Sequence, residues 1–391
     1  MKVLWLAPYP LNALGNLPVK HRVKSQHPAT WIVNLSDALT ENYPSLDLHI
    51  LTETAYVSKS FSMLRKNITF HVVRSGGAIP FLLRGYPGKF RFDVWTNYFI
   101  NCFRISNVIQ IVKPDLIHTH GTETCYSYAA IKSFPKDKVI ISLQGIMNHI
   151  LRDQVSWTAN KMKNLECFVI NNGCHFIAKT TFAHQFIEQN NKSACIYHIE
   201  NAVHDSFWRV GWCPQKNVVL FVGSVIKEKG IENLITAVKT VPNALLHIIG
   251  SGPESYNRYL KKLVINLGLS QRVRWLGYLD STNIAQEFSH AKVLVLPSHM
   301  ENSPNVLIEA MSVGLPVIAN DVGGIRNLLR EYDRGSVINT NNINELSRAL
   351  IASLNTLKDA QPLYDRSIFQ NRFHKRYVSE KYFKIYNQII R

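Results

Sequence analysis

Two glutamates, Glu301 and Glu309, flank the predicted start of a helix. The short apolar run 293–296 predicts a strand, and residues 305–312 predict a short helix. A polar loop joins the two and carries Glu301, whereas Glu309 lies inside the helix. Carboxylates accept hydrogen bonds from hydroxyl groups, so such a pair can hold a hexose on one side and a ribose on the other. As an isolated pair, two solvated glutamates on a surface helix would be the simpler explanation.

The start of this predicted helix favours an anionic ligand. Ser303 is expected to be the N-cap and Pro304 to lie in the first turn, where the missing N–H of proline costs nothing. The backbone N–H groups of Asn305 and Val306 then have no acceptor within the helix, and the helix dipole favours negative charge there. A pyrophosphate suits this position.

Length and charge restrict the class of protein. A chain of 391 residues is too long for one ordinary core and predicts two or three domains. Its 44 Lys and Arg against 27 Asp and Glu give a net charge of +17. That excess indicates an anionic partner: nucleic acid, an acidic lipid surface or a phosphorylated substrate. The sequence contains no nucleic-acid recognition motif, so we expect no nucleic-acid partner.

The cysteines and the apolar runs indicate the compartment. The six cysteines form no CxxC pair and no disulfide framework, which favours reduced thiols and a cytoplasmic protein. The N-terminal run is interrupted by Pro8 and predicts a buried strand instead of a secretion signal. No apolar run reaches the ~18 residues of a membrane span. If a membrane is involved, we expect peripheral attachment to the inner face of the plasma membrane.

Alternating strands and helices predict a doubly wound α/β architecture. We expect a first domain at 1–203, a linker at 204–216, a second domain at 217–370 and a terminal helix at 371–391. The linker is expected because 205–216 contains Gly211 and Pro214 and has no clear period.

A basic and aromatic tract lies between Tyr56 and Gln110. It holds eight basic residues and one acid, Asp93, and large aromatic side chains are interleaved with them. Cations beside rings suit an anionic membrane interface. The rings at 92, 95, 99 and 103 also follow helical spacing, which is typical of core packing, and the sequence leaves both interpretations open.

Two histidines, His118 and His120, lie at the end of the predicted strand 115–118 and just after it. Gly121 and the polar residues that follow mark a loop at the carboxyl edge of the sheet, where ligands bind in α/β folds. A single buried histidine is more often a packed core residue than a ligand-binding one. From their positions alone, either His118 or His120 can face a ligand.

The segment 294–324 resembles the donor-binding signature of the family 4 retaining glycosyltransferases, also called glycosyl transferases group 1. The resemblance includes the flanking strand, the Ser-Pro-Asn turn, the E-x7-E pair, the Gly-Leu-Pro-Val-Ile run and the Val-Gly-Gly loop, in that order. It extends, more weakly, over the rest of the chain. It implies a GT-B fold, in which two Rossmann-like domains face a central cleft, the first binding the acceptor and the second a nucleotide-sugar.

The resemblance also implies roles for individual residues. His120, Glu301 and Lys229 would be catalytic, and Gly15, His118 and Gln144 would bind the acceptor or the sugar. The implied donor-binding residues are Gly223, Ser224, Lys229, Glu301, Ser303, Pro304, Asn305, Val306 and Glu309. Glu301 would position the donor sugar and Glu309 the ribose, while the departing phosphate would help to deprotonate the acceptor.

Three positions depart from the family pattern. Ser224 stands where relatives have an arginine on the donor phosphates, and Gln144 stands where many have a histidine. Gly15 is alone where relatives have a glycine pair. The loss of one charged hydrogen bond at Ser224 would cost roughly 1.5 to 3 kcal/mol of donor binding.

We therefore expect a retaining hexosyltransferase that moves a sugar from a nucleotide-diphosphate donor to a glycan or lipid-linked glycan, in cell-surface polysaccharide synthesis. The sequence has no Asp-x-Asp motif and no His/Cys cluster at metal-ligand spacing, so neither a metal nor another cofactor is implied. A sugar-nucleotide epimerase or a phosphorylase of the same fold is the alternative. A basic nucleic-acid-binding protein would explain only the charge.

Overall fold

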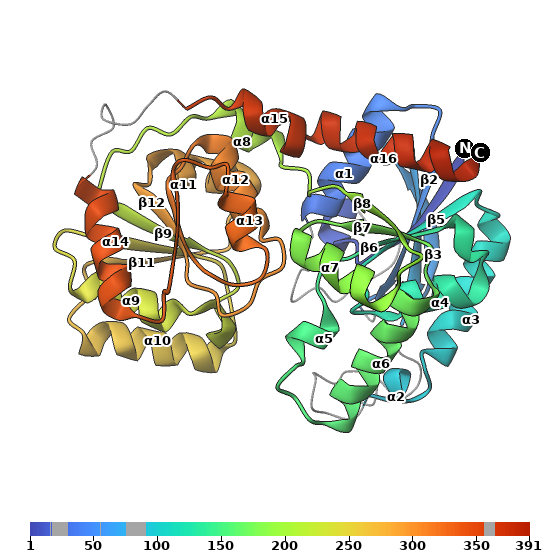
Figure 1. Ribbon diagram of the computed structural model, residues 1–391, viewed down its shortest axis with the longest axis horizontal. Coiled ribbons are helices and arrows are strands. Elements are labelled where there is room, and N and C mark those ends of the chain that lie inside the picture. The colour runs from blue at the N-terminus through green and yellow to red at the C-terminus, as the bar shows by residue number, and fades with distance from the viewer. Residues whose placement is uncertain (16, 18–29, 55, 76–90, 356–363) are drawn as a thin grey trace. The chain divides into compact units, whose positions relative to one another are not determined.

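The computed structural model describes residues 1–15, 17, 30–54, 56–75, 91–355 and 364–391 (Figure 1). The chain forms two compact units. The first contains Met1–Ala202 and Arg376–Arg391, and the second contains Val203–Lys375. Each unit is an α/β sheet covered by helices, and the two are described separately below.

The first unit is built on an eight-stranded sheet with the order β3-β4-β2-β1-β5-β6-β7-β8. All neighbouring strands run parallel except β3 and β4, which form an antiparallel hairpin at one edge. The strands are β1 (Lys2–Leu6), β2 (Asp47–Thr54), β3 (Phe61–Arg65), β4 (Ile68–Arg74), β5 (Leu116–His120), β6 (Val139–Ser142), β7 (His175–Ala178) and β8 (Cys195–His198). The order changes direction between β1 and β5, which is where ligands bind in such sheets.

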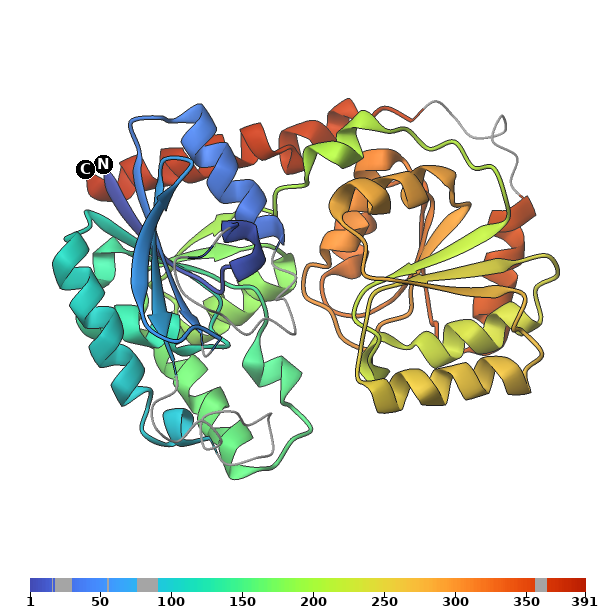
Figure 2. The same cartoon turned by 180° about the vertical axis from the view of Figure 1, so that it is seen from behind.

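Helices cover both faces of this sheet, so its central strands are apolar throughout. Alternate residues of β1 point to opposite faces: Leu4 and Leu6 pack on one side, and Val3 and Trp5 pack on the other. The helices are α1 (Thr30–Asn42), α2 (Phe92–Trp95), α3 (Phe99–Val112), α4 (Cys125–Ser133), α5 (Met147–Ile150), α6 (Trp157–Asn172), α7 (Thr181–Asn190) and α16 (Lys375–Ile390), with short 3-10 turns η1 (Leu11–Leu14) and η2 (Lys136–Lys138). Figure 2 shows the sheet from behind.

The second unit has a six-stranded parallel sheet with the order β11-β10-β9-β12-β13-β14. Its strands are β9 (Val218–Val222), β10 (Leu245–Ile249), β11 (Val273–Gly277), β12 (Val293–Leu296), β13 (Val317–Asn320) and β14 (Gly335–Ile338). Its helices are α8 (Asp205–Arg209), η3 (Lys227–Lys229), α9 (Ile231–Lys239), α10 (Glu254–Asn266), α11 (Ser281–His290), α12 (Asn305–Val313), α13 (Ile325–Leu329), α14 (Ile343–Asn355) and α15 (Ser367–Phe373). Two parallel, doubly wound α/β sheets confirm the expected pair of Rossmann-like domains.

Two boundaries differ from the expected ones. Residues 204–216 belong to the second unit, and part of them forms α8, which buries Phe207 in that unit's core. The terminal helix is two helices: α15 ends at Phe373, His374 adopts an extended conformation beside Val203, and α16 begins at Lys375. The apolar residues of α16 pack into the core of the first unit. None of the helices among the described residues is long and apolar enough to span a bilayer.

Candidate functional site

The predicted donor residues gather at the carboxyl edge of the second sheet. The strand order changes direction between β9 and β12, so the loops that follow these two strands lie next to each other. His299 N–H donates to the carbonyl oxygen of Glu228 at 2.8 Å and ties the loops together. Gly230 has φ +66°, and a Cβ there would lie 2.1 Å from the carbonyl oxygen of Pro297. Only glycine allows the two loops to approach so closely.

The two predicted catalytic residues of this unit form an ion pair. The Lys229 ammonium, on η3 after β9, donates to Oε1 of Glu301, in the loop after β12. Both side chains are mostly buried, at 25% and 10% exposed. The pair is suited to a ligand that carries both phosphate and hydroxyl groups. A lysine ammonium can donate to phosphate oxygens, and a carboxylate can accept from hydroxyl groups.

The helix α12 begins at Asn305, as the sequence predicted, but its N-cap differs. Pro304, and not Ser303, is the N-cap, with extended backbone angles of φ −71° and ψ 116°, and no side chain caps the helix. The expected capping role of Ser303 is therefore wrong: its hydroxyl is buried and has no hydrogen-bond partner among the described residues. Asn305 and Val306 are the first helical residues, so the anion-binding geometry expected of the helix start remains.

Glu309 lies one turn inside α12 and is partly buried. Burial raises the pKa of its carboxyl group to about 7. A carboxyl group that ionises near neutral pH can switch between donating a hydrogen bond and accepting two.

The loop after β9 contains Gly223 and Ser224, and Ser224 is exposed at the carboxyl edge. The glycines of the next loop, Gly250 and Gly252, permit its close packing: a Cβ on them would lie 1.8 Å from the carbonyl oxygens of Gly223 and Val225, respectively. Close packing between the two loops therefore explains why both positions are glycine.

The two histidines of the first unit have different surroundings. His118 is fully buried; its Nδ1 lies 2.7 Å from the Tyr386 hydroxyl and its Nε2 lies 2.7 Å from the Ser142 hydroxyl. With both ring nitrogens engaged, His118 is a core residue, which corrects the expectation that it binds sugar. His120 is 2% exposed, and neither of its ring nitrogens has a partner among the described residues. Such a group favours a ligand that completes its hydrogen bonds.

The imidazole of His120 packs against three aromatic side chains. Its centroid lies 4.5 Å from that of Trp5, 5.4 Å from that of Trp31 and 4.0 Å from that of His118. Burial, and then the charges of His118 and Lys179, keep the pKa of His120 well below its usual value. The imidazole is therefore neutral at neutral pH, with one donor and one acceptor nitrogen.

Gln144, the third predicted sugar-binding residue, follows β6 next to the end of β5. Its Oε1 accepts a hydrogen bond of 2.6 Å from Nζ of Lys179, which follows β7. The sequence did not single out Lys179, although it directly follows the short buried strand 175–178 in the same sheet. Its position directly after a buried strand, at the carboxyl edge of the sheet, could have identified Lys179 from the sequence.

Glu123 was also missed. It follows His120 by three residues, and its Oε1 accepts a hydrogen bond from the N–H of Gly145, in the loop after β6. Burial raises the pKa of this carboxyl group to about 7. A Cβ on Gly121 would lie 2.1 Å from Oε2 of Glu123, so the loop needs glycine there.

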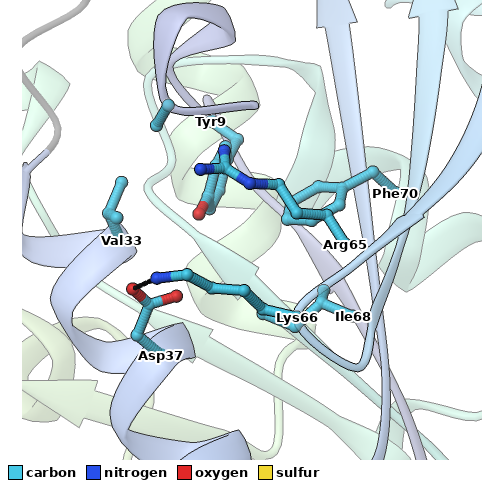
Figure 3. A pocket seen from close by; sticks show the side chains of 8 residues that line it. Tyr9, Val33, Asp37, Arg65, Lys66, Ile68 and Phe70 are labelled. Atoms are coloured by element: carbon cyan, nitrogen blue, oxygen red, sulfur yellow. Dashed lines mark hydrogen bonds and ion pairs between the residues drawn. The ribbon is translucent and has the colours of Figure 1, made fainter. Parts of the chain in front are cut away.

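The loop after β1 contains Gly15, which ends η1 with φ 76° and is exposed. The nearby cations Lys20, Arg22 and Lys24 lie outside the described residues. Between η1, α1 and the β3–β4 hairpin is a hollow of about 40 Å³, in which Lys66 donates to Asp37 at 2.9 Å beside Tyr9 and Arg65 (Figure 3). This volume suits a few water-sized groups and is too small for a sugar.

Among the described residues, no group of three or more His, Cys, Asp or Glu side chains could hold a metal ion.

Comparison with known proteins gives the class. Residues 204–366 match the family model described as "Glycosyl transferases group 1". The uncharacterized glycosyltransferase MJ1178 of Methanocaldococcus jannaschii is 25% identical over 348 residues, which are 88% of this chain and 89% of that protein. The lipopolysaccharide core biosynthesis glycosyltransferase LpsE of Rhizobium meliloti is 28% identical over 170 residues, 43% of this chain and 49% of that protein.

The fold agrees with this class. The crystal structure of Anabaena HepE in complex with UDP-glucose superposes with a TM-score of 0.71 at 16% identity, covering 99% of this chain and 100% of that one. Two Rossmann-like units of this kind define the GT-B fold. Residues 204–366 thus carry the pattern of the glycosyl transferases group 1 family, and the protein is a glycosyltransferase that transfers a sugar from a nucleotide-sugar donor.

Proposed function

We propose that this glycosyltransferase moves a hexose from a nucleotide-diphosphate sugar to a lipid-linked glycan at an anionic membrane surface, in cell-surface polysaccharide synthesis. In this proposal the second unit binds the donor. The diphosphate meets Lys229 and the N-terminal N–H groups of α12, Glu301 accepts hydrogen bonds from the sugar hydroxyls, and Glu309 accepts them from the ribose. The first unit binds the acceptor next to His120, Gln144 and Gly15.

The observation that carries the choice of a lipid acceptor is an exposed group of apolar side chains on α2 and α3, here called the aromatic patch: Trp95, Phe99, Ile100 and Phe103. Trp95, Phe99 and Phe103 are 53%, 71% and 64% exposed. Core packing, the other interpretation, does not account for these three rings, whereas Phe92, the fourth ring of the series, is partly buried. Trp157, at the start of α6, is also exposed, and α6 contacts α2 (Figures 1 and 2).

Two further features support the same acceptor. The chain carries a net charge of +17, which favours attraction to acidic lipids. LpsE, a relative, is described as a lipopolysaccharide core transferase. Arg91, one of the eight basic residues of the tract between Tyr56 and Gln110, contributes less than its charge suggests, because it forms an ion pair with Asp93. Lys89, another cation of this tract, lies outside the described residues.

Sedimentation with lipid vesicles tests the membrane part of the proposal. The triple variant Trp95→Ser, Phe99→Ser, Phe103→Ser should lose binding to phosphatidylglycerol vesicles, by about tenfold for each ring that would be buried, since a buried ring contributes roughly 1.5 kcal/mol or more. The control is the pair Tyr259→Ser, Ile265→Ser, which removes equally exposed apolar groups from α10 of the second unit. Equal binding of both variants and wild type would reject the patch as a membrane contact.

The donor and the reaction are tested separately. UDP-, GDP-, ADP- and CMP-sugars should be compared for their effect on the melting temperature, with Glu309→Ala as the comparison, because a ligand that binds only the folded state raises it. The stabilising donor, radiolabelled in its sugar, is then incubated with a lipid extract. Label in the organic phase supports a lipid-linked acceptor, whereas label released as free sugar without an acceptor favours an epimerase-type reaction.

A further inference from the structure

Lys179 is a buried cation at the carboxyl edge of the first sheet. Its side chain is 2% exposed. Its ammonium donates to Oε1 of Gln144 at 2.6 Å and to Oδ1 of Asn201, and it lies 4.4 Å from the ring centroid of Trp31. A buried ammonium is costly unless it is well paired: burial lowers the pKa of Lys179 well below its usual value, and the charge of Glu123 acts in the opposite direction.

The partners of Lys179 come from three separate parts of the chain. Gln144 follows β6, Asn201 follows β8, and Trp31 lies in the first turn of α1. The indole of Trp31 in turn packs against the imidazole of His120. Lys179 therefore joins the two candidate acceptor-binding side chains of this edge, one directly and one through a ring.

The chemistry of the ammonium fixes the orientation of Gln144. An ammonium can only donate, so the amide of Gln144 must turn its oxygen toward Lys179 and its nitrogen away. Two N–H groups of Lys179 are used by amide oxygens, and the indole face of Trp31 lies next to the third. The ammonium is enclosed by protein, which argues against direct contact with a substrate phosphate.

We propose that Lys179 is a positioning residue of the acceptor site: it holds the amide of Gln144 and the indole of Trp31, and through Trp31 the imidazole of His120, in the arrangement that binds hydroxyl groups of a sugar acceptor. This inference rests on the proposed function, since it requires that the first unit binds the acceptor. It assigns to Lys179 a role that Gln144 and His120 cannot perform alone, because the Lys179 ammonium orients the amide of Gln144 and lies over the indole on which His120 packs.

The first test needs no substrate. In protein with isotope-labelled histidine, Lys179→Met should shift the ring resonances of His120 and raise its pKa, because a nearby positive charge is lost. The charge of Lys179 acts on His118 as well as on His120, so the internal reference is His175, at the start of β7, whose resonances should stay in place. Unchanged His120 resonances in folded Lys179→Met protein would overturn the proposal, as would equal changes at His120 and His175.

The second test separates the acceptor from the donor. With the radiolabelled donor and lipid extract, Lys179→Met should raise the acceptor KM at least tenfold and change the donor KM less than twofold. Lys192→Met, which removes an exposed lysine of the same unit outside the basic and aromatic tract, should change neither. Lys179→Arg keeps the charge but is longer and planar, so it should also raise the acceptor KM; a folded Lys179→Arg with an unchanged acceptor KM would overturn the proposal.

The two tests also separate this inference from the proposed function. If the wild type transfers no label to lipid but Lys179→Met still displaces His120, the lipid acceptor is wrong and the positioning role within the first unit stands. If transfer occurs and Lys179→Met raises the donor and acceptor KM equally, the function stands and the positioning role is wrong.

Discussion

The hydroxyl oxygen of Tyr386 lies 2.7 Å from Nδ1 of His118, although 268 residues separate the two in the sequence. The same hydroxyl accepts a hydrogen bond of 3.0 Å from Nε1 of Trp5. Its own proton is thus available to His118 Nδ1, which leaves Nε2 of His118 to donate to Ser142. The C-terminal helix α16 thereby fixes one neutral tautomer of His118 directly beside His120.

Removal of the Tyr386 hydroxyl should destabilise the first unit. In Tyr386→Phe, two buried groups, the Trp5 N–H and the His118 Nδ1, each lose a partner, and we expect the free energy of unfolding to fall by about 1 to 3 kcal/mol. Urea denaturation measures this loss. Tyr377→Phe, on a more exposed position of the same helix, should cost less than about 0.5 kcal/mol. If the two variants were equally stable, the buried network would not contribute to stability.

Glu309 should make donor binding depend on pH. Its pKa of about 7 in the unliganded protein means that the carboxyl group is half protonated at neutral pH, whereas ribose hydroxyls donate to the ionised form. Donor affinity, measured by calorimetry with UDP, should therefore weaken by up to about tenfold per pH unit below 7. Glu309→Gln should remove this dependence. Glu287→Gln, at a carboxylate whose pKa is lowered by its hydrogen bond from His247, should keep it.

The same carboxyl group should affect stability in the opposite direction. Its folded-state pKa lies above the usual 4.5, so the folded state binds the extra proton between these values. The contribution to stability is fully present below pH 4.5 and is lost as the pH rises through 7. Comparison of wild type with Glu309→Gln by urea denaturation between pH 5 and 8 isolates this contribution. A wild type that gained stability relative to Glu309→Gln toward pH 8 would contradict the raised pKa.

The sequence was sufficient where the relevant residues are neighbours in the chain. The loop and helix from Val293 to Val313 carry their own strand, turn and stop signals, so Glu301, Glu309 and the helix start were found without the structure. Ser303 was misassigned as the N-cap because the fixed φ of proline suits the last extended residue as well as the first helical one. Residue preference alone does not separate these two positions.

The sequence was insufficient where distant residues meet. Lys179, Gln144 and Asn201 each follow a different strand, and only the strand order brings them together. The choice between His118 and His120 likewise depends on Tyr386, at the other end of the chain. The exposure of Phe99 and Phe103 could not be read from their helical spacing, because a helix buries a face only where another element covers it.

An arginine at position 224 should strengthen donor binding. Ser224 is exposed after β9, in the same loop as Lys229, at the position where the resemblance to family 4 implies an arginine. Ser224→Arg should add a charged hydrogen bond to the donor diphosphate, worth roughly 1.5 to 3 kcal/mol, and tighten UDP binding by about ten- to a hundredfold. Ser251→Arg places the same charge on the loop after β10 and should have a smaller, salt-sensitive effect. Equal gains from both variants would indicate general attraction instead of a defined phosphate contact.

Gly323 should be required for the position of the Glu301 loop. It has φ +55°, and a Cβ there would lie 1.7 Å from the carbonyl oxygen of Glu301, so Gly323→Ala must displace that backbone. Gly268 is the matched control: its φ is +70°, but a Cβ there would have no atom within 4 Å. In both alanine variants the left-handed backbone conformation should lower the free energy of unfolding by about 1 to 2 kcal/mol. In urea denaturation, only Gly323→Ala should lose more than this. It should also weaken UDP-sugar binding, because a shift of the Glu301 carbonyl moves the Glu301 side chain away from Lys229. Equal stability losses with unchanged affinity in both variants would show that the loop adapts, and that the Lys229–Glu301 pair does not depend on this contact.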